Sequence, residues 1–244
     1  MSHIHVGIDL AWSRTHRSGL AAVDRDGRVL DSATALDDDE ILAWIDDVGE
    51  PLVLGIDAPV VVRNASGMRQ GERELSRVFS RFGAGPYPTS RAFPLFDPPR
   101  AEELAEQAGW STDADRAATA SRPLAVEVYP HPALVSWFEL PRRLAYKRGP
   151  DRRAELDRLC GLLEQREALR LPDHPRWPTL RSVVRDGRGA ALKAAEDEVD
   201  AIVCAHLAWT WHERPGELVL YGDPAEGAIV APRAPVHRPG GWTS

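Results

Sequence analysis

Two similar apolar segments of this chain each end in an aspartate, and they constrain the fold more than any other feature. Residues 7–11 read Gly-Ile-Asp-Leu-Ala, and residues 55–59 read Gly-Ile-Asp-Ala-Pro. Each follows an apolar run of strand length, which predicts a buried strand with Asp9 or Asp57 at its carboxyl end. Open α/β sheets bind ligands at the carboxyl ends of their parallel strands. For either aspartate alone, a turn or capping role is the alternative.

The remaining patterns predict an α/β fold with a mixed sheet flanked by helices. Residues 3–12 alternate apolar and polar side chains, and Asp26-Gly27 separates two further short apolar runs, so the chain is expected to open with a three-strand antiparallel meander. Pro130 and Pro132 are expected to stop a later strand. The further expected elements are a helix ending near 48, strands at 51–59, 124–129, 218–221 and 228–230, and helices at 70–80, 98–109, 151–169 and 190–212.

The chain of 244 residues fits a single domain over residues 1–232. Within it, residues 60–122 are expected to form an arginine-rich insertion, and the Pro- and Gly-rich residues 233–244 a loose tail. No apolar run approaches the roughly 20 residues of a membrane-spanning helix, so no membrane partner is expected. The two cysteines lie far apart, and no basic leader opens the chain, which together predict a cytoplasmic protein.

The net charge of −7 conceals an uneven distribution. Residues 60–100, 142–158 and 176–193 together hold 19 basic and 7 acidic side chains, whereas the rest of the chain holds 11 and 30. Nucleic acid is therefore not excluded as a partner, although an ion-paired surface is the alternative. Of the 30 basic residues only Lys147 and Lys193 are lysines, which we interpret as the composition of a genome that favours arginine.

Three more acids occupy positions where a charge needs an explanation. Glu127 lies inside an otherwise apolar strand, with a buried salt bridge to an arginine as its alternative role. Asp197 and Asp200 are three residues apart and share a helix face, beside the apolar stripe of that helix. Their neighbours Glu196 and Glu198 are expected to face solvent.

Together, five carboxylates suggest a site for hard divalent cations. We predict catalytic roles for Asp9, Asp57, Glu127, Asp197 and Asp200, with all but Glu127 as metal ligands. Mg²⁺ or Mn²⁺ prefers oxygen ligands, and two such ions activate water for attack on a phosphodiester. Without metal, so many clustered acids would raise one another's pKa.

The order of these motifs resembles a known family. Gly-Ile-Asp-Leu-Ala, Gly-Ile-Asp-Ala-Pro, Glu-Val-Tyr-Pro-His at 127–131, Tyr-Lys-Arg-Gly at 146–149 and Asp-Glu-Val-Asp-Ala at 197–201 are similar to domain-of-unknown-function family 429 over residues 3–231. That family is described as predicted nucleases of RNase H-like fold. The acidic pair of the last long helix also resembles that of RuvC-type resolvases. The resemblance implies an RNase H-like fold and a metal site at Asp9, Asp57, Asp197 and Asp200.

Basic side chains near these acids are candidates for binding phosphate groups. We single out Arg69, Arg73, Arg91, Lys147 and Arg148, with His131 as a further substrate-binding candidate. The pair His3-x-His5 has the spacing of metal ligands on one strand face. Because it precedes the strand end that carries Asp9, we expect a structural or surface role for it.

These features favour a divalent-metal-dependent nuclease or related phosphodiester hydrolase acting on DNA or RNA. One alternative is a small-molecule phosphotransferase or ATPase of actin-like fold, since Gly-Ile-Asp-Leu also opens such proteins. Against it, no Gly-rich phosphate loop is present. Another alternative is a non-catalytic nucleic-acid-binding protein, for which salt-dependent binding without turnover is expected. A homodimer remains open.

Overall fold

Five strands form one mixed sheet in the order β3–β2–β1–β4–β5 in a computed structural model that describes residues 3–116, 118–119 and 121–236. β1 (Ile4–Asp9), β2 (Ser18–Val23) and β3 (Val29–Ala35) are antiparallel, and β4 (Pro51–Ile56) and β5 (Leu124–Glu127) run parallel to β1. This order and these directions are those of an RNase H-like fold, which confirms the predicted fold class.

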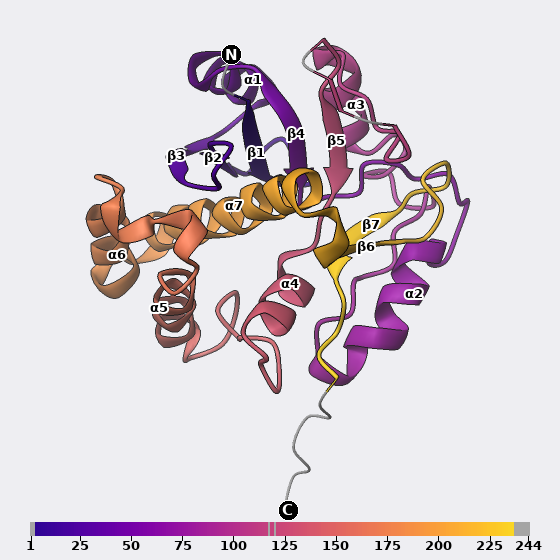
Figure 1. Cartoon of the computed structure of the whole chain (residues 1–244). Coiled ribbons are helices and arrows are strands. Elements are labelled where there is room, and N and C mark those ends of the chain that lie inside the picture. The colour runs from indigo at the N-terminus through magenta and orange to yellow at the C-terminus, as the bar shows by residue number, and fades with distance from the viewer. Residues whose placement is uncertain (1–2, 117, 120, 237–244) are drawn as a thin grey trace, which may run out of the picture.

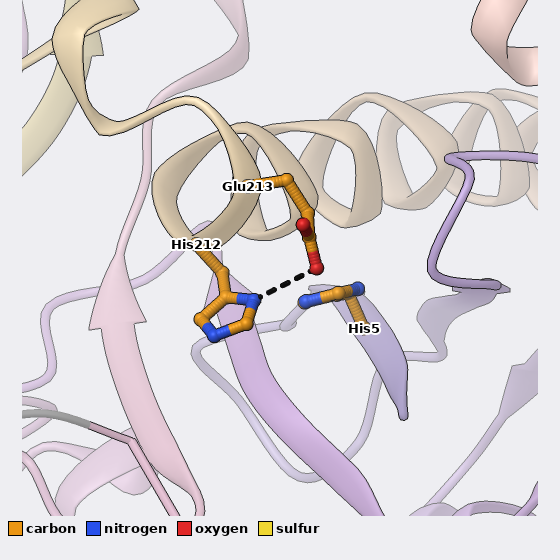
Figure 2. Close-up of side chains that lie close together, drawn as sticks. All are labelled: His5, His212 and Glu213. Carbon is orange, nitrogen blue, oxygen red and sulfur yellow. Dashed lines mark hydrogen bonds and ion pairs between the residues drawn. The ribbon is translucent and has the colours of Figure 1, made fainter. Parts of the chain in front are cut away.

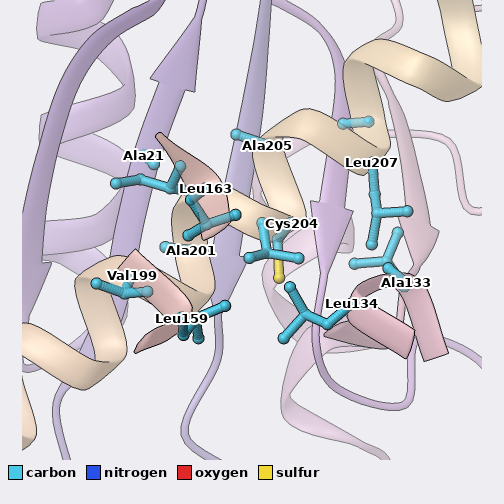
Figure 3. Close-up of a cluster of buried hydrophobic side chains, with 14 of the residues drawn as sticks. Ala21, Ala133, Leu134, Leu159, Leu163, Val199, Ala201, Cys204, Ala205 and Leu207 are labelled. Atoms are coloured by element: carbon cyan, nitrogen blue, oxygen red, sulfur yellow. The ribbon is translucent and has the colours of Figure 1, made fainter. Parts of the chain in front are cut away.

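The longest helix, α7 (Gly189–Glu213), lies across one face of this sheet (Figure 1). Apolar side chains of α7 fill the space between the sheet and the helices α4 (Pro130–Trp137) and α5 (Arg152–Leu163), as Figure 3 shows. Because α7 has neighbours on both sides, residues all around it are buried, including the acids near its start.

Glycine explains how closely α7 approaches the sheet. A Cβ atom on Gly7 of β1 would collide with the backbone of Ala201 and Ala205, and one on Gly55 of β4 with the carbonyl oxygen of Cys204. The two glycines of the repeated Gly-Ile-Asp motif therefore allow main chain to rest on main chain. The aspartate two residues after each glycine is thereby held beside the first half of α7.

The other face of the sheet is covered by α1 (Asp38–Val48) and α3 (Arg100–Ala108). Ile41 and Ile45 of α1 and Leu104 of α3 pack there on the outward apolar residues of β1 and β4. Asp37 caps α1 by accepting a hydrogen bond from the backbone of Glu40 at 2.9 Å. The sheet is therefore a central layer between two hydrophobic cores.

The segment between β4 and β5 contains α2 (Gln70–Phe79) and α3, and its other parts are irregular apart from a short 3₁₀ turn at Ser80–Phe82. α2 contacts a separate two-stranded sheet of β6 (Leu218–Tyr221) and β7 (Ile229–Pro232). The remaining long helix, α6 (Trp177–Asp186), packs against α5 and α7, and short 3₁₀ turns lie at Glu167–Leu169, Leu171–Asp173 and Pro215–Glu217.

Most predicted elements are present, with two differences. The prolines expected only to stop β5 instead open α4, because proline is well suited to the first helical turn, where its missing N–H has no partner to lose. α6 had no counterpart among the expected elements. Of the expected loose tail, residues 237–244 lie outside the described residues. Among the described residues, no helix has the length and apolar character to cross a membrane.

Candidate active-site cleft

Asp9 and Asp57 lie side by side where two parallel strands end. Ile8 of β1 is in register with Ile56 of β4, and the Asp57 N–H donates to the Ile8 carbonyl oxygen at 2.8 Å. Both aspartates line a cavity of about 650 Å³, which Asp197 of α7 also lines. We call this cavity the carboxylate cleft. The repeated motif thus brings three predicted acids into one cavity.

Asp200, the fourth predicted aspartate, lies one helical turn beyond Asp197 and is fully buried. The Tyr146 hydroxyl donates to its Oδ1 atom at 2.7 Å, and the Lys147 ammonium lies 2.7 Å from its Oδ2 atom. Lys147 itself lines the carboxylate cleft. Asp200 therefore holds a cation at the cleft wall instead of facing the cavity directly.

The flanking glutamates of α7 do not face solvent, contrary to expectation. Glu196 and Glu198 are only 3% and 5% exposed. Glu198 binds the Arg176 guanidinium at 2.9 Å and accepts a hydrogen bond from Ser32 at 3.0 Å, whereas Glu196 lies 3.0 Å from the Lys193 ammonium. Because α7 is covered by other elements on several sides, the sequence pattern of the helix did not reveal which of its acids are exposed.

Burial and mutual repulsion shift the protonation of the cleft acids. Burial raises the pKa of Asp9, and it raises the pKa of Asp57 well above the usual value; Lys147 opposes both shifts, while neighbouring aspartate charges reinforce them. Burial and the charge of Asp9 raise the pKa of Asp197 to about 7. The charged forms of these aspartates are therefore disfavoured in the absence of a cation.

Two lysines form the ion pairs with the aspartates of this region. Lys193 lies 2.5 Å from Asp197 Oδ1, and both Lys193 and Lys147 line the cleft. Although burial opposes the charged form, the charges of Asp200 and Asp9 raise the pKa of Lys147 well above its usual value. These are the chain's two lysines. From the sequence we attributed the scarcity of lysine to genome composition. In the structure, both lysines line the same cleft.

Glu127, predicted to be catalytic, lies in a closed network beside the cleft. Its two oxygens accept from Arg69 at 2.6 and 2.7 Å, and one of them also accepts from the Val60 N–H at 3.1 Å. Arg69 is 3% exposed and binds Glu72 at 2.8 Å as well. This geometry is the buried salt bridge to an arginine that was the alternative role for Glu127. A catalytic role for Glu127 and a phosphate-binding role for Arg69 stay predictions.

The other predicted substrate-binding residues divide into two groups. His131, Lys147 and Arg148 line the carboxylate cleft. Arg73 and Arg91 do not; Arg73 donates to the Met68 carbonyl oxygen, and Arg91 donates to that of Val62 at 3.0 Å. Burial lowers the pKa of His131 to about 3, so its imidazole is neutral at physiological pH.

Several further residues line the cleft besides the predicted acids and basic side chains. Most come from the loop after β1 and the segment after α4, whereas Tyr87 lies between α2 and α3 and Tyr129 directly precedes α4. Besides Lys193, those with charged or aromatic side chains are Trp12, His16, Arg17, Tyr87, Tyr129 and Arg143. Trp12 and Tyr87 are 43% and 66% exposed, so aromatic surface is available at the cleft.

The three aspartates that line the cleft have the oxygen chemistry that Mg²⁺ and Mn²⁺ prefer. Their raised pKa values indicate that a divalent ion would relieve a real electrostatic cost. In the described residues, however, no three of the cleft aspartates offer oxygen atoms within 4.8 Å of one another. The donor set thus fits such an ion, with side-chain rotation needed to close around it.

Comparison with known proteins gives one match. A family model described as "protein of unknown function (DUF429)" matches residues 7–226, a span that contains the three cleft aspartates, Asp200 and both lysines. No curated protein and no solved structure matches the chain. Since the family model covers most of the sequence, the chain belongs to the DUF429 family.

Proposed function

We propose that the carboxylate cleft hydrolyses phosphodiester bonds in nucleic acid with the help of bound Mg²⁺ or Mn²⁺. The observation that supports this most strongly is the convergence of Asp9, Asp57 and Asp197 from two strand ends and one helix on a single cavity. Acids of such different origin along the chain, gathered at the ligand-binding edge of an α/β sheet, are expected at a catalytic centre.

Asp9, Asp57 and Asp197 would hold the metal, which when bound supplies an activated water and neutralises charge on the phosphate. Lys147 and Lys193 fix the carboxylates of Asp200 and Asp197. In this arrangement Asp200 positions Lys147, which presents its ammonium group at the cleft wall. The lysines thus maintain the cluster before an ion arrives.

Cationic and aromatic side chains around the acids suit a phosphate-bearing polymer. Arg17, Arg143 and Arg148 line the cleft and are exposed, so their guanidinium groups can bind phosphate oxygens. Trp12 and Tyr87 offer exposed ring surface on which a base can stack. A substrate with alternating phosphates and bases uses both features together.

The first test is cleavage of single-stranded DNA, branched DNA and RNA–DNA hybrid in Mg²⁺ or Mn²⁺, with and without EDTA. We expect metal-dependent cleavage of at least one substrate, and a loss of about 100-fold or more in Asp57→Asn, as when a key electrostatic group is removed from other active sites. The matched control is Asp46→Asn, an exposed acid of α1, which should retain full activity. Equal rates in wild type and Asp57→Asn would contradict the proposal.

A further inference from the structure

A second group of metal-type ligands lies at the other end of α7. His212 and Glu213 are its last two residues, and His5 lies on the adjacent strand β1. The rings of His5 and His212 have centroids 5.3 Å apart, and His212 Nδ1 lies 3.0 Å from Glu213 Oε1. One ligand atom from each residue lies within 4.8 Å of the other two, and Figure 2 shows the three side chains converging.

The burial and hydrogen bonding of the His5 imidazole indicate that it lacks a ligand. Its side chain is completely buried, at 0% exposure. The ring lies close enough to the backbone of Asp24 for a weak hydrogen bond, but no well-formed hydrogen bond reaches either ring nitrogen within the described part of the chain. An unsatisfied polar group in the interior costs about 1–3 kcal/mol, and most buried imidazoles avoid that cost through a partner. A ligand that accepts the nitrogen lone pair would provide one.

We propose that His5, His212 and Glu213 bind one divalent transition-metal ion of the zinc class. Two imidazole nitrogens and one carboxylate oxygen form a donor set that Zn²⁺ favours, unlike the all-oxygen set of the carboxylate cleft. Ligand atoms about 2.1 Å from one zinc ion lie about 3.4 Å apart, so small rotations of the exposed His212 and Glu213 side chains close the site.

The electrostatic surroundings favour a cation at this position. The carbonyl groups at the end of α7 carry the negative end of the helix dipole. In the next residue, Arg214, the guanidinium carbon lies 4.8 Å from the centroid of the Trp209 ring, and Nη1 lies 3.5 Å from Glu217 Oε1, so this charge is directed elsewhere. The exposed side of the site leaves a fourth coordination position to water.

This site is separate from the carboxylate cleft. Four residues of β1 separate His5 from Asp9, which is about 13 Å in an extended strand. Fifteen residues of α7 separate Asp197 from His212, or about 22 Å along a helix. An ion at the new site would join the first strand to the end of the longest helix, and it would therefore stabilise the folded chain.

The test is titration of the EDTA-treated full-length protein with Co²⁺ and Zn²⁺, in wild type and in an Asp57→Asn background that weakens binding at the cleft. We expect one equivalent of Co²⁺ to produce the visible absorption bands of nitrogen-ligated cobalt, and Zn²⁺ to raise Tm. His212→Gln and Glu213→Gln should each weaken Co²⁺ binding at least tenfold and abolish the Tm increase.

The matched control is Glu106→Gln, an exposed acid of α3, and this variant should bind both ions as wild type does. His212 and Glu213 are both exposed, so their variants are expected to fold, which circular dichroism checks. Absence of the cobalt bands in wild type, or their persistence with unchanged affinity in both variants, overturns the site. Neither result depends on nuclease activity, so this experiment and the cleavage assay test the two proposals independently.

Discussion

Two groups of buried acids lie next to each other in this molecule and differ in how their charge is balanced. Around Arg69, the carboxylates of Glu72 and Glu127 are saturated by the guanidinium and by neighbouring N–H and hydroxyl donors, including those of Thr89. Around the carboxylate cleft, Asp197 and Asp200 each pair with one lysine, whereas Asp9 and Asp57 form no side-chain ion pair among the described residues. In the first group each carboxylate is paired within the protein, whereas the second contains two carboxylates without a paired cation.

The difference shows that burial alone does not tell which acids are paired within the protein. Glu127 and Asp57 both lie at the carboxyl ends of neighbouring parallel strands, in β5 and just after β4. What separates them is the number of donors that reach each carboxylate. A carboxylate whose hydrogen-bonding capacity is filled by the protein serves the fold, and one that is left partly empty is available to a ligand.

The largest expected effect comes from breaking the closed network. Arg69→Met leaves Glu72 and Glu127 buried without their cation, so we expect unfolding free energy to fall by about 3–5 kcal/mol. Urea denaturation at pH 7.5 measures it. Arg73→Met, on the exposed side of the same helix, should change stability by less than about 0.5 kcal/mol. A similar small loss for both variants would show that the network contributes little.

Replacing an acid by its amide should have opposite signs in the two groups. Because burial raises the pKa of Asp57 well above the usual value, its charge is unfavourable in the folded state. In EDTA, Asp57→Asn is therefore expected to stabilise the chain by about 1 kcal/mol, as often happens when a catalytic charge is removed. Glu127→Gln should destabilise it by about 1–3 kcal/mol, because an amide cannot accept from Arg69 at both atoms. Two changes of the same sign would remove the distinction.

The smallest effect concerns pH. Asp197 has its pKa raised to about 7 when folded, against an ordinary value of 3.8, so its contribution to stability is present at low pH and declines as the pH rises toward 7. Relative to wild type, Asp197→Asn should therefore gain about 1–2 kcal/mol between pH 6 and pH 8. Urea unfolding of both proteins in EDTA at these two pH values measures the difference. A constant difference would indicate that Asp197 titrates normally.

Sequence patterns predicted the strand ends well and the partners of the acids poorly. Asp9 and Asp57 could be placed because a period of two residues and parallel pairing fix where a strand ends. The bond between Arg69 and Glu127 spans 58 residues, and no local pattern reports a pairing over that distance. α4 was missed because a proline after a strand has two local meanings, and only tertiary packing selects between them.

The histidine pair His3-x-His5 also shows that a local pattern does not reveal partners far away in the sequence. Its spacing indicated two ligands on one strand, and a structural role was preferred because the strand's other end carried the acids. The described structure groups His5 instead with His212 and Glu213, more than 200 residues later. Alternation along the strand was visible in sequence, but the helix end that meets it was not.

The contact of α7 with Gly7 and Gly55 has a consequence for how this family can vary. Where main chain rests on main chain, no side chain lies between the two surfaces to be enlarged, trimmed or repacked. The distance from strand to helix is then fixed by backbone contact. We therefore expect substitutions elsewhere in the core to leave the spacing between Asp9 and Asp197 unchanged.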